Sequence, residues 1–536
     1  MTARLGLIVA VLAVETVLAS YCIQLSPLNS LSVTAEIIHT IQHWLFRFMI
    51  AYGITLAMLS YLRTGVYAAA AAAAENAPLR WGWAGVHIVL LVPFIYLSLQ
   101  LYATSPAMPF ALLAPAWHLC ALAGSLALFA FMAPLAVWRN VLRQTQPLPL
   151  FAVLPAAAAV AAIRASQLLW GPAARVTFRI VKGLLHPLLP QLQSDPATLV
   201  IGTSRFAVQI AEVCSGLEGI GLLLAFCAGW LWLFRRDYYF PRALLIVPLG
   251  VLVIFLLNAV RIAALVLIGN AGYDRVAILG FHSQAGWIAF NLTAFGIAIV
   301  AHRTPWVSRA ARRAAGPAAR AGAVKSGAAN PTAAFLMPLL VILAAGMISH
   351  AVSADFEFPY PLRLVAALAA LWLYRRSYAD LNWRCTWRAP AVGALVFLLW
   401  VASAAVLTRP AGTPSALRAL SGPLSATWIA CRILAAVFTV PIAEELAYRG
   451  YLLRRLIGPH FESIPLSAAR WPALAVSSAA FGIMHGALWL PGMIAGFAYG
   501  ALAVGTNRLG ESIAAHGTTN ALLAVYVLAF DQWQLW

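Results

Sequence analysis

Long apolar runs separated by short polar loops dominate this chain. Most runs approach 20 residues, the length of helix that crosses the hydrocarbon core of a bilayer. Period-two alternation, which is typical of outer-membrane barrel strands, is not apparent. The pattern predicts eight spans in the first part of the chain, near 5–24, 42–62, 81–103, 108–137, 149–170, 216–234, 243–268 and 284–301. It predicts seven more near 333–351, 362–374, 390–408, 426–447, 472–490, 492–506 and 512–530.

The expected fold class is therefore all-α, a polytopic integral membrane protein with about 15 transmembrane helices in two bundles. Composition agrees, because 63% of the residues are hydrophobic, 10% are charged and the mean hydropathy is +0.86. Soluble domains carry about 25% charged residues. The apolar run at 5–21 resembles a signal peptide, but it lacks a convincing small-residue cleavage site. We interpret it as the first membrane helix.

A basic segment divides the predicted spans into two groups. Residues 302–331 hold six Arg or Lys and no acid, among Ala, Gly and Pro. This composition is typical of a flexible linker. We predict a membrane domain over 1–303, a basic cytoplasmic linker over 304–331 and a second membrane domain over 332–536. The two halves share no evident repeat, which disfavours a transporter built from internal repeats.

The net charge of +19 lies mostly in short arginine-bearing loops between spans. This distribution is the positive-inside signature, and no aromatic-interleaved basic patch indicates nucleic-acid binding. Assigning those loops to the cytoplasm leaves 171–213 as the longest extracytoplasmic segment. Its stretch at 176–192 predicts a helix lying in the membrane interface, with a plain connecting loop as the alternative.

Six cysteines are scattered without CxxC spacing, so neither a zinc site nor a disulfide framework is indicated. Four of them, at positions 22, 120, 227 and 431, fall in or beside apolar runs and are interpreted as small buried hydrophobes. No cofactor and no metal is expected.

Three polar residues lie at the predicted extracytoplasmic ends of three different spans. They are Cys214 in EVCSGLEG, Arg261 in NAVRI and His282 in GFHSQAGWIAF. A thiol, a fixed cation and an imidazole can act as nucleophile, oxyanion stabiliser and general acid/base. Each also has a structural interpretation: a packed cysteine, a snorkelling arginine and an interfacial histidine. An arginine inside an apolar run favours function.

At these residues the chain resembles the exosortase family of multi-spanning membrane enzymes. The resemblance covers roughly 100–303 and rests on the Cys-Ser-Gly context at Cys214, on Asn258 with Arg261, and on the His282, Gly286 and Phe290 pattern. It implies a cysteine protease/transpeptidase that cleaves C-terminal sorting signals. The implied partners are membrane-anchored proteins ending in a recognition motif, a transmembrane helix and a basic tail.

A second constellation lies near the other end of the chain, in EELAYRG, FGIMH and HGTTN. Arg449 follows Glu445 by four residues and can neutralise it on one helix face, which leaves Glu444 to polarise water. His485, His516 and Asn520 could complete such a site. A buried polar network and a zinc site are the alternatives, although the HExxH pattern is absent.

These three motifs resemble the CAAX-processing and bacteriocin-processing (CPBP) family of intramembrane glutamic proteases, across about 333–536. The resemblance implies that Glu444 and His485 activate water, that His516 and Asn520 bind the oxyanion, and that Glu445 and Arg449 support them. The order of the two domains resembles the exosortase E/protease type, which is associated with VPEID-type C-terminal signals.

The expected function is a membrane cysteine protease/transpeptidase fused to an intramembrane glutamic endopeptidase. The expected location is the bacterial cytoplasmic (inner) membrane, with the lipid bilayer and membrane-anchored substrates as partners and no nucleic acid. The positive-inside rule places the Cys214 site on the extracytoplasmic side and the glutamates toward the cytoplasmic half. A non-enzymatic scaffold or transporter remains the alternative, as does a C-terminal half that only positions substrate.

Overall fold

The computed structural model describes residues 44, 48, 51–52, 55–56, 79–101, 108–211, 214, 216–314, 330–408 and 411–536. The chain forms two compact units, Met1–Leu168 and Leu169–Trp536. The predicted spans at 5–24 and 42–62 lie outside or almost outside the described residues, as does most of the linker predicted at 304–331. The predicted boundary between two membrane domains therefore stays a prediction.

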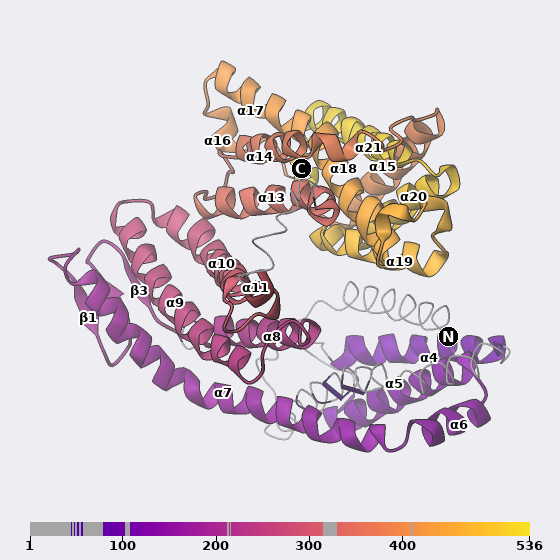
Figure 1. Ribbon diagram of the computed structural model, residues 1–536, viewed down its shortest axis with the longest axis horizontal. Helices are drawn as coiled ribbons and strands as arrows, with labels where there is room; N and C mark the ends of the chain where they lie inside the picture. The colour runs from indigo at the N-terminus through magenta and orange to yellow at the C-terminus, as the bar shows by residue number, and fades with distance from the viewer. Residues whose placement is uncertain are drawn as a thin grey trace. The chain divides into compact units, whose positions relative to one another are not determined.

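Helices make up the described part of the first unit (Figure 1). They are α4 (Trp81–Leu101), α5 (Phe110–Met132), α6 (Leu135–Thr145) and the first part of α7 (Leu148–Leu185). Polar contacts join α4 to α5: His87 Nδ1 lies 2.9 Å from the Gly124 carbonyl oxygen, and Trp117 Nε1 donates to Ser98 Oγ. The predicted span at 108–137 is broken before α6, because Pro134 has no N–H to continue the helix.

The second unit begins with the end of α7 and a three-stranded antiparallel sheet in the order β1-β2-β3. The strands are β1 (Gln193–Asp195), β2 (Val200–Gly202) and β3 (Ala207–Gln209). The separate interfacial helix predicted at 176–192 is wrong in its bounds, since α7 continues unbroken to Leu185. The described chain is otherwise helical, in agreement with the predicted all-α class, and strands of three residues are too short to show a period in sequence.

Three helices that pack on one another follow the sheet, namely α8 (Leu217–Leu233), α9 (Ile246–Asn270) and α10 (His282–Arg303). Short α11 (Arg309–Ala314) comes next. The remaining helices are α13 (Pro331–Ala351), α14 (Pro361–Leu373), α15 (Arg388–Leu407), α16 (Ser415–Arg418), α17 (Gly422–Leu434), α18 (Val440–Glu445), α19 (Trp471–Ile483), α20 (Trp489–Thr506) and α21 (Leu509–Phe530). Asn330 caps α13 by accepting from Ala333 N at 3.3 Å, with Pro331 at the first helical position.

Three π-helical segments lie beside residues that the sequence singles out. Val276–Phe281 runs directly into His282, and Ala435–Thr439 and Leu446–Leu453 flank α18, which ends in Glu444 and Glu445. A π turn inserts an extra residue and re-aims the side chains that follow, and such turns are frequent at functional sites. Local backbone irregularity therefore coincides with both constellations.

Nine helices in the described part are long and apolar enough to cross a membrane, and four shorter apolar helices accompany them. Other parts of the protein leave most of their surface uncovered: in Trp81–Gln100 only 17% of the residues in the apolar stretch are buried. A helix that is apolar all round without being buried by protein belongs in lipid. The chain is thus a multi-pass membrane protein, whereas the predicted count of about 15 spans in two bundles is not reached in the residues described.

Two candidate active sites

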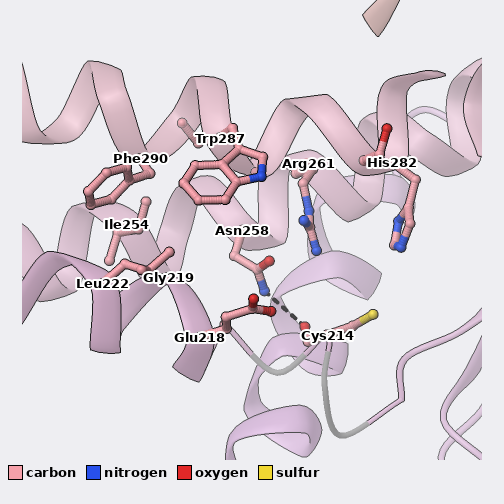
Figure 2. A pocket seen from close by; sticks show the side chains of 14 residues that line it. Cys214, Glu218, Gly219, Leu222, Ile254, Asn258, Arg261, His282, Trp287 and Phe290 are labelled. Carbon is pink, nitrogen blue, oxygen red and sulfur yellow. Dashed lines mark hydrogen bonds between the residues drawn. The ribbon is translucent and has the colours of Figure 1, made fainter. Parts of the chain in front are cut away.

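A cavity of about 260 Å³ lies between α8, α9 and α10 (Figure 2). Cys214 borders it just before α8, while Arg261 reaches it from α9 and His282 from the start of α10. Figure 2 shows the Arg261 and His282 side chains extending from their helices toward Cys214. The structure therefore brings the three predicted residues to one cavity, and their catalytic roles stay a prediction.

The backbone at Cys214 is held against α9. Asn258 Nδ2 donates to the Cys214 carbonyl oxygen at 3.0 Å, and Cys214 N donates to Ala211 O at 2.9 Å. Gly216 has a φ of +91°, the left-handed region that favours glycine, and a Cβ there would lie 3.0 Å from Asn258 Nδ2. Glycine at 216 thus allows both the turn into α8 and the close approach of Asn258.

The Arg261 guanidinium occupies space that a glycine leaves open. A Cβ on Gly286 of α10 would lie 2.8 Å from Arg261 Nη1. Arg261 Nε is buried and has no hydrogen-bond partner among the described residues. A buried donor without a partner costs about 1–3 kcal/mol, so this guanidinium retains donor capacity for a ligand in the cavity.

This cavity has one further charged residue, which was not singled out from the sequence, and an apolar wall that includes the predicted Phe290. Glu218 lines it one turn after Cys214 and interacts electrostatically with Arg261. Beyond these charges, the wall becomes apolar at Leu222, Ile254, Trp287 and Phe290. The cavity therefore joins a polar end to an apolar end, which suits a peptide segment leaving a membrane.

A second cavity, of about 190 Å³, lies among the C-terminal helices. Glu444 from α18, His485 just after α19, and His516 and Asn520 from α21 all line it. The other lining residues are Tyr360, Trp400, Arg432, Ala436, Val440, Phe481, Ala495, Tyr499, Thr519, Leu523, Leu535 and Trp536. The four residues predicted to form the second catalytic site thus come together from three segments of the chain.

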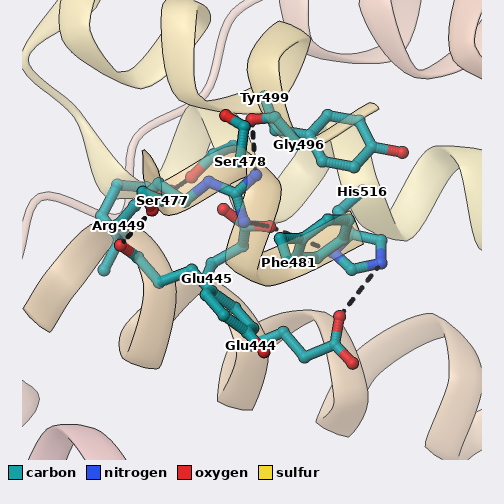
Figure 3. A network of polar contacts seen from close by, with 12 residues as sticks. Glu444, Glu445, Arg449, Ser477, Ser478, Phe481, Gly496, Tyr499 and His516 are labelled. Atoms are coloured by element: carbon teal, nitrogen blue, oxygen red, sulfur yellow. Dashed lines mark hydrogen bonds and ion pairs between the residues drawn. The ribbon is translucent and has the colours of Figure 1, made fainter. Parts of the chain in front are cut away.

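Glu445 and Arg449 form a buried pair behind this cavity (Figure 3). Arg449 Nη1 donates to Glu445 Oε1 at 3.0 Å, and the two side chains are 1% and 0% exposed. Arg449 Nη2 also donates to the Gly496 carbonyl at 2.6 Å. The pairing expected from the i,i+4 spacing is therefore present, and it leaves both residues out of the cavity lining.

His516 connects the buried pair to Glu444. Its Nδ1 lies 3.1 Å from Glu445 Oε1, and its Nε2 lies 3.9 Å from Glu444 Oε2. Tyr499 stacks on the imidazole at 5.0 Å between ring centroids, and its hydroxyl donates to Thr519 Oγ1 at 2.7 Å. A carboxylate on one side and a ring on its face hold His516 in a single orientation beside Glu444.

The orientation of His485 follows from a backbone contact. His485 Nδ1 lies 2.8 Å from the Phe481 carbonyl oxygen, which can only accept, so Nδ1 carries the proton. Nε2 of the neutral ring is then the atom that can take a proton. Asn520 Nδ2 donates to the Ala436 carbonyl at 2.7 Å, which uses one of its two hydrogens.

Arg449→Met is expected to lower the free energy of unfolding by about 3–5 kcal/mol, because it leaves the Glu445 carboxylate buried without its cation. Thermal unfolding of the full-length protein in detergent measures the effect. Arg455→Met is the matched control, since Arg455 is exposed. Equal melting temperatures for the two variants would contradict a structural role for the pair.

Comparison with known protein families bears on the second cavity alone. Residues 426–522 match the family model described as "Type II CAAX prenyl endopeptidase Rce1-like". The C-terminal part of the chain carries an Rce1-like intramembrane protease domain of the CAAX type. The matched residues include Glu444, His485, His516 and Asn520, and the Cys214 cavity lies outside them. No curated protein and no solved structure matches the chain.

Trp400 and Arg432 are among the cavity residues that lie outside the sequence motifs and carry polar groups. Trp400 Nε1 is buried without a hydrogen-bond partner in the described part, and its ring meets His485 edge-on at 5.4 Å. Trp400 precedes the matched residues. Arg432 lies within them but belongs to none of the three motifs. Neither position has a helical spacing to a motif residue that could have identified it.

Among the described residues, no group of three or more His, Cys, Asp or Glu has the arrangement of a metal site. The polar groups of the second cavity are instead bound to one another or directed at the cavity. Glu444 Oε2 is buried and accepts no hydrogen bond from the described residues, so it can accept one from a water molecule. The arrangement fits a carboxylate that activates water.

Proposed function

We propose that this chain is a bifunctional membrane peptidase. One activity is an intramembrane glutamic endopeptidase at Glu444, and the other is a cysteine protease/transpeptidase at Cys214. The observation that supports the first is the convergence of Glu444, His485, His516 and Asn520 on one cavity within the family-matched residues. Cleavage of membrane-anchored peptides by the full-length protein in lipid vesicles, compared between Glu444→Gln and Cys214→Ala, tests both activities.

At the glutamic site, Glu444 takes a proton from a water molecule, whose oxygen attacks the peptide carbonyl carbon. His485 Nε2 positions that water and shares the proton. The second Nδ2 hydrogen of Asn520 and the Nε2–H of an imidazolium His516, whose Nδ1–H is held by Glu445, stabilise the oxyanion. The Trp400 indole N–H is a further donor at the same cavity. The C–N bond then breaks, and the proton passes from Glu444 to the leaving amine.

At the cysteine site, His282 takes the proton of the Cys214 thiol, and the sulfur attacks the peptide carbonyl. Arg261 stabilises the oxyanion through its free donors. The amine departs with the proton from His282 and leaves a thioester on Cys214. Water or an incoming amine attacks the thioester, which releases or transfers the acyl part of the substrate and regenerates the thiol.

Gly286→Ala is expected to slow the cysteine-site reaction by about tenfold, because the new methyl group would displace the guanidinium of Arg261 by a few tenths of an ångström. Release of a reporter with a C-terminal sorting signal measures it. Gly296→Ala on the same helix is the matched control, since a Cβ there meets nothing within 4 Å. Equal rates in both variants would count against the role of Arg261.

The proposed substrates are membrane-anchored proteins with a C-terminal motif, a transmembrane helix and a basic tail. The proposed location is the bacterial inner membrane, with the Cys214 site on the extracytoplasmic side and the Glu444 site toward the cytoplasmic half. A scaffold or transporter is the alternative function, and unchanged processing in both Glu444→Gln and Cys214→Ala would favour it.

A further inference from the structure

Arg432 places an unpaired positive charge on the wall of the Glu444 cavity. It lies in the last turn of α17, and the helical path continues through the π turn to Glu444. No ion pair among the described residues includes Arg432. Among the described Arg, Lys, Asp and Glu residues, the other one that borders this cavity is Glu444.

Aromatic rings surround the Arg432 guanidinium and restrict its orientation. Its Cζ lies 4.2 Å from the ring centroid of Tyr360, 5.6 Å from that of Trp536 and 5.9 Å from that of Trp428. Tyr360 and Trp428 are 5% and 8% exposed, so the cage is part of the protein core. Ring faces attract the cation but accept none of its five N–H donors in the way an anion does.

Glu357 attracts Arg432 electrostatically but is already bound by another arginine. Glu357 receives both Arg363 Nε and Arg363 Nη2 at 2.9 Å, a bidentate pair. Such a pair occupies the carboxylate, and Glu357 makes neither a hydrogen bond nor a salt bridge to Arg432 in the described part of the chain. A guanidinium within a membrane domain is costly unless it meets an anion, so the missing partner is expected to come from a ligand.

The size and the lining of the cavity limit which ligands it can bind. Its volume of about 190 Å³ is below the roughly 300–1,000 Å³ of pockets for drug-sized molecules. Ala436, Val440, Leu523 and Leu535 give it an apolar lining. A cavity of this size can enclose only the end or a side chain of an apolar peptide, with the rest of the peptide outside it, and the anion that such a peptide can offer is a carboxylate.

From these observations we infer that Arg432 binds a carboxylate of the peptide substrate, either the free chain end or an Asp or Glu side chain. This inference rests on the proposed endopeptidase function and specifies its substrate class. Arg432 and Glu444 line the same small cavity, so cleavage is expected close to the bound carboxylate.

The test uses full-length protein in lipid vesicles and three fluorescent apolar peptides of alanine, leucine and tryptophan. One ends in a free carboxylate, one in a carboxamide, and one in a carboxamide preceded by Asp. The wild type should cleave the free acid about 10- to 100-fold faster than the plain amide, mainly through KM. Cleavage of the Asp peptide at the rate of the free acid would assign the site to side-chain carboxylates.

Arg432→Gln should bring the acid-to-amide ratio close to one, and Arg432→Lys should restore part of it. The exposed Arg455→Gln is the control and should keep the wild-type ratio. A purely structural role for Arg432 would change the rates of all three peptides alike. A wild-type ratio of one for both carboxylate peptides would overturn the inference.

Binding separates this inference from the proposed activity. Fluorescence anisotropy of the same peptides on Glu444→Gln measures recognition without cleavage. The Glu444→Gln variant should bind a carboxylate peptide more tightly than the amide peptide, and the double variant Glu444→Gln/Arg432→Gln should lose this difference. That result supports the subsite even if no peptide is cleaved. Equal binding of all three peptides overturns the subsite, whereas equal cleavage by wild type and Glu444→Gln overturns the endopeptidase.

Discussion

Glu444→Gln is expected to reduce intramembrane peptide cleavage by about 10²–10⁴-fold, because an amide cannot take the proton of the attacking water. The substitution keeps the size of the side chain and removes its charge. Glu444 is 16% exposed and borders the cavity, so the change should leave the fold intact. Cleavage of a fluorescent membrane peptide by the purified full-length protein measures the loss.

Glu462→Gln provides the control, since this carboxylate is exposed in the short helix Phe461–Ser463. It should cleave at the wild-type rate. A Glu444→Gln variant with normal melting temperature and normal cleavage would remove Glu444 from the reaction. Loss of cleavage together with a lowered melting temperature in Glu444→Gln would instead indicate that the residue supports structure, as proposed for Glu445.

Most helix positions follow from the lengths of the apolar runs. The spans predicted at 333–351 and 512–530 correspond to Pro331–Ala351 and Leu509–Phe530. The run at 426–447 is less regular, since it contains α17, a π turn and α18. Hydropathy reports how favourable it is for a segment to lie in lipid. It carries no information on whether each backbone N–H donates to the carbonyl four residues earlier, as in an α-helix, or five residues earlier, as in a π-helix.

The residues of the candidate sites could likewise be predicted from the sequence only in part. Residues at i,i+4 share a helix face, so the pairing of Glu445 with Arg449 could be predicted. Trp400 and Arg432 reach the cavity only because separate helices pack beside one another, and no local spacing encodes that. Glu218 stood within the quoted Cys214 motif, yet a single acid at the start of a helix is also a common favourable charge at the helix N-terminus.

Cys214→Ala is expected to abolish release of a C-terminal sorting signal, with a loss on the order of 10⁶-fold, the scale for removing a catalytic nucleophile. The reason is that no other thiol lines the described cavity. Accumulation of uncleaved reporter protein in cells, and loss of thioester formation by the purified protein, measure the effect. Cleavage at the Glu444 site should continue in this variant, because the two cavities have separate lining residues.

Cys385→Ala is the matched control, since Cys385 is an exposed free cysteine. A thiol-alkylating reagent should inhibit signal release by Cys385→Ala as strongly as by the wild type, because Cys214 remains in both. Normal signal release by Cys214→Ala would show that the thiol takes no part in the reaction. In that case Arg261 and His282 would border a binding cavity, and the peptidase chemistry of the chain would reside at Glu444 alone.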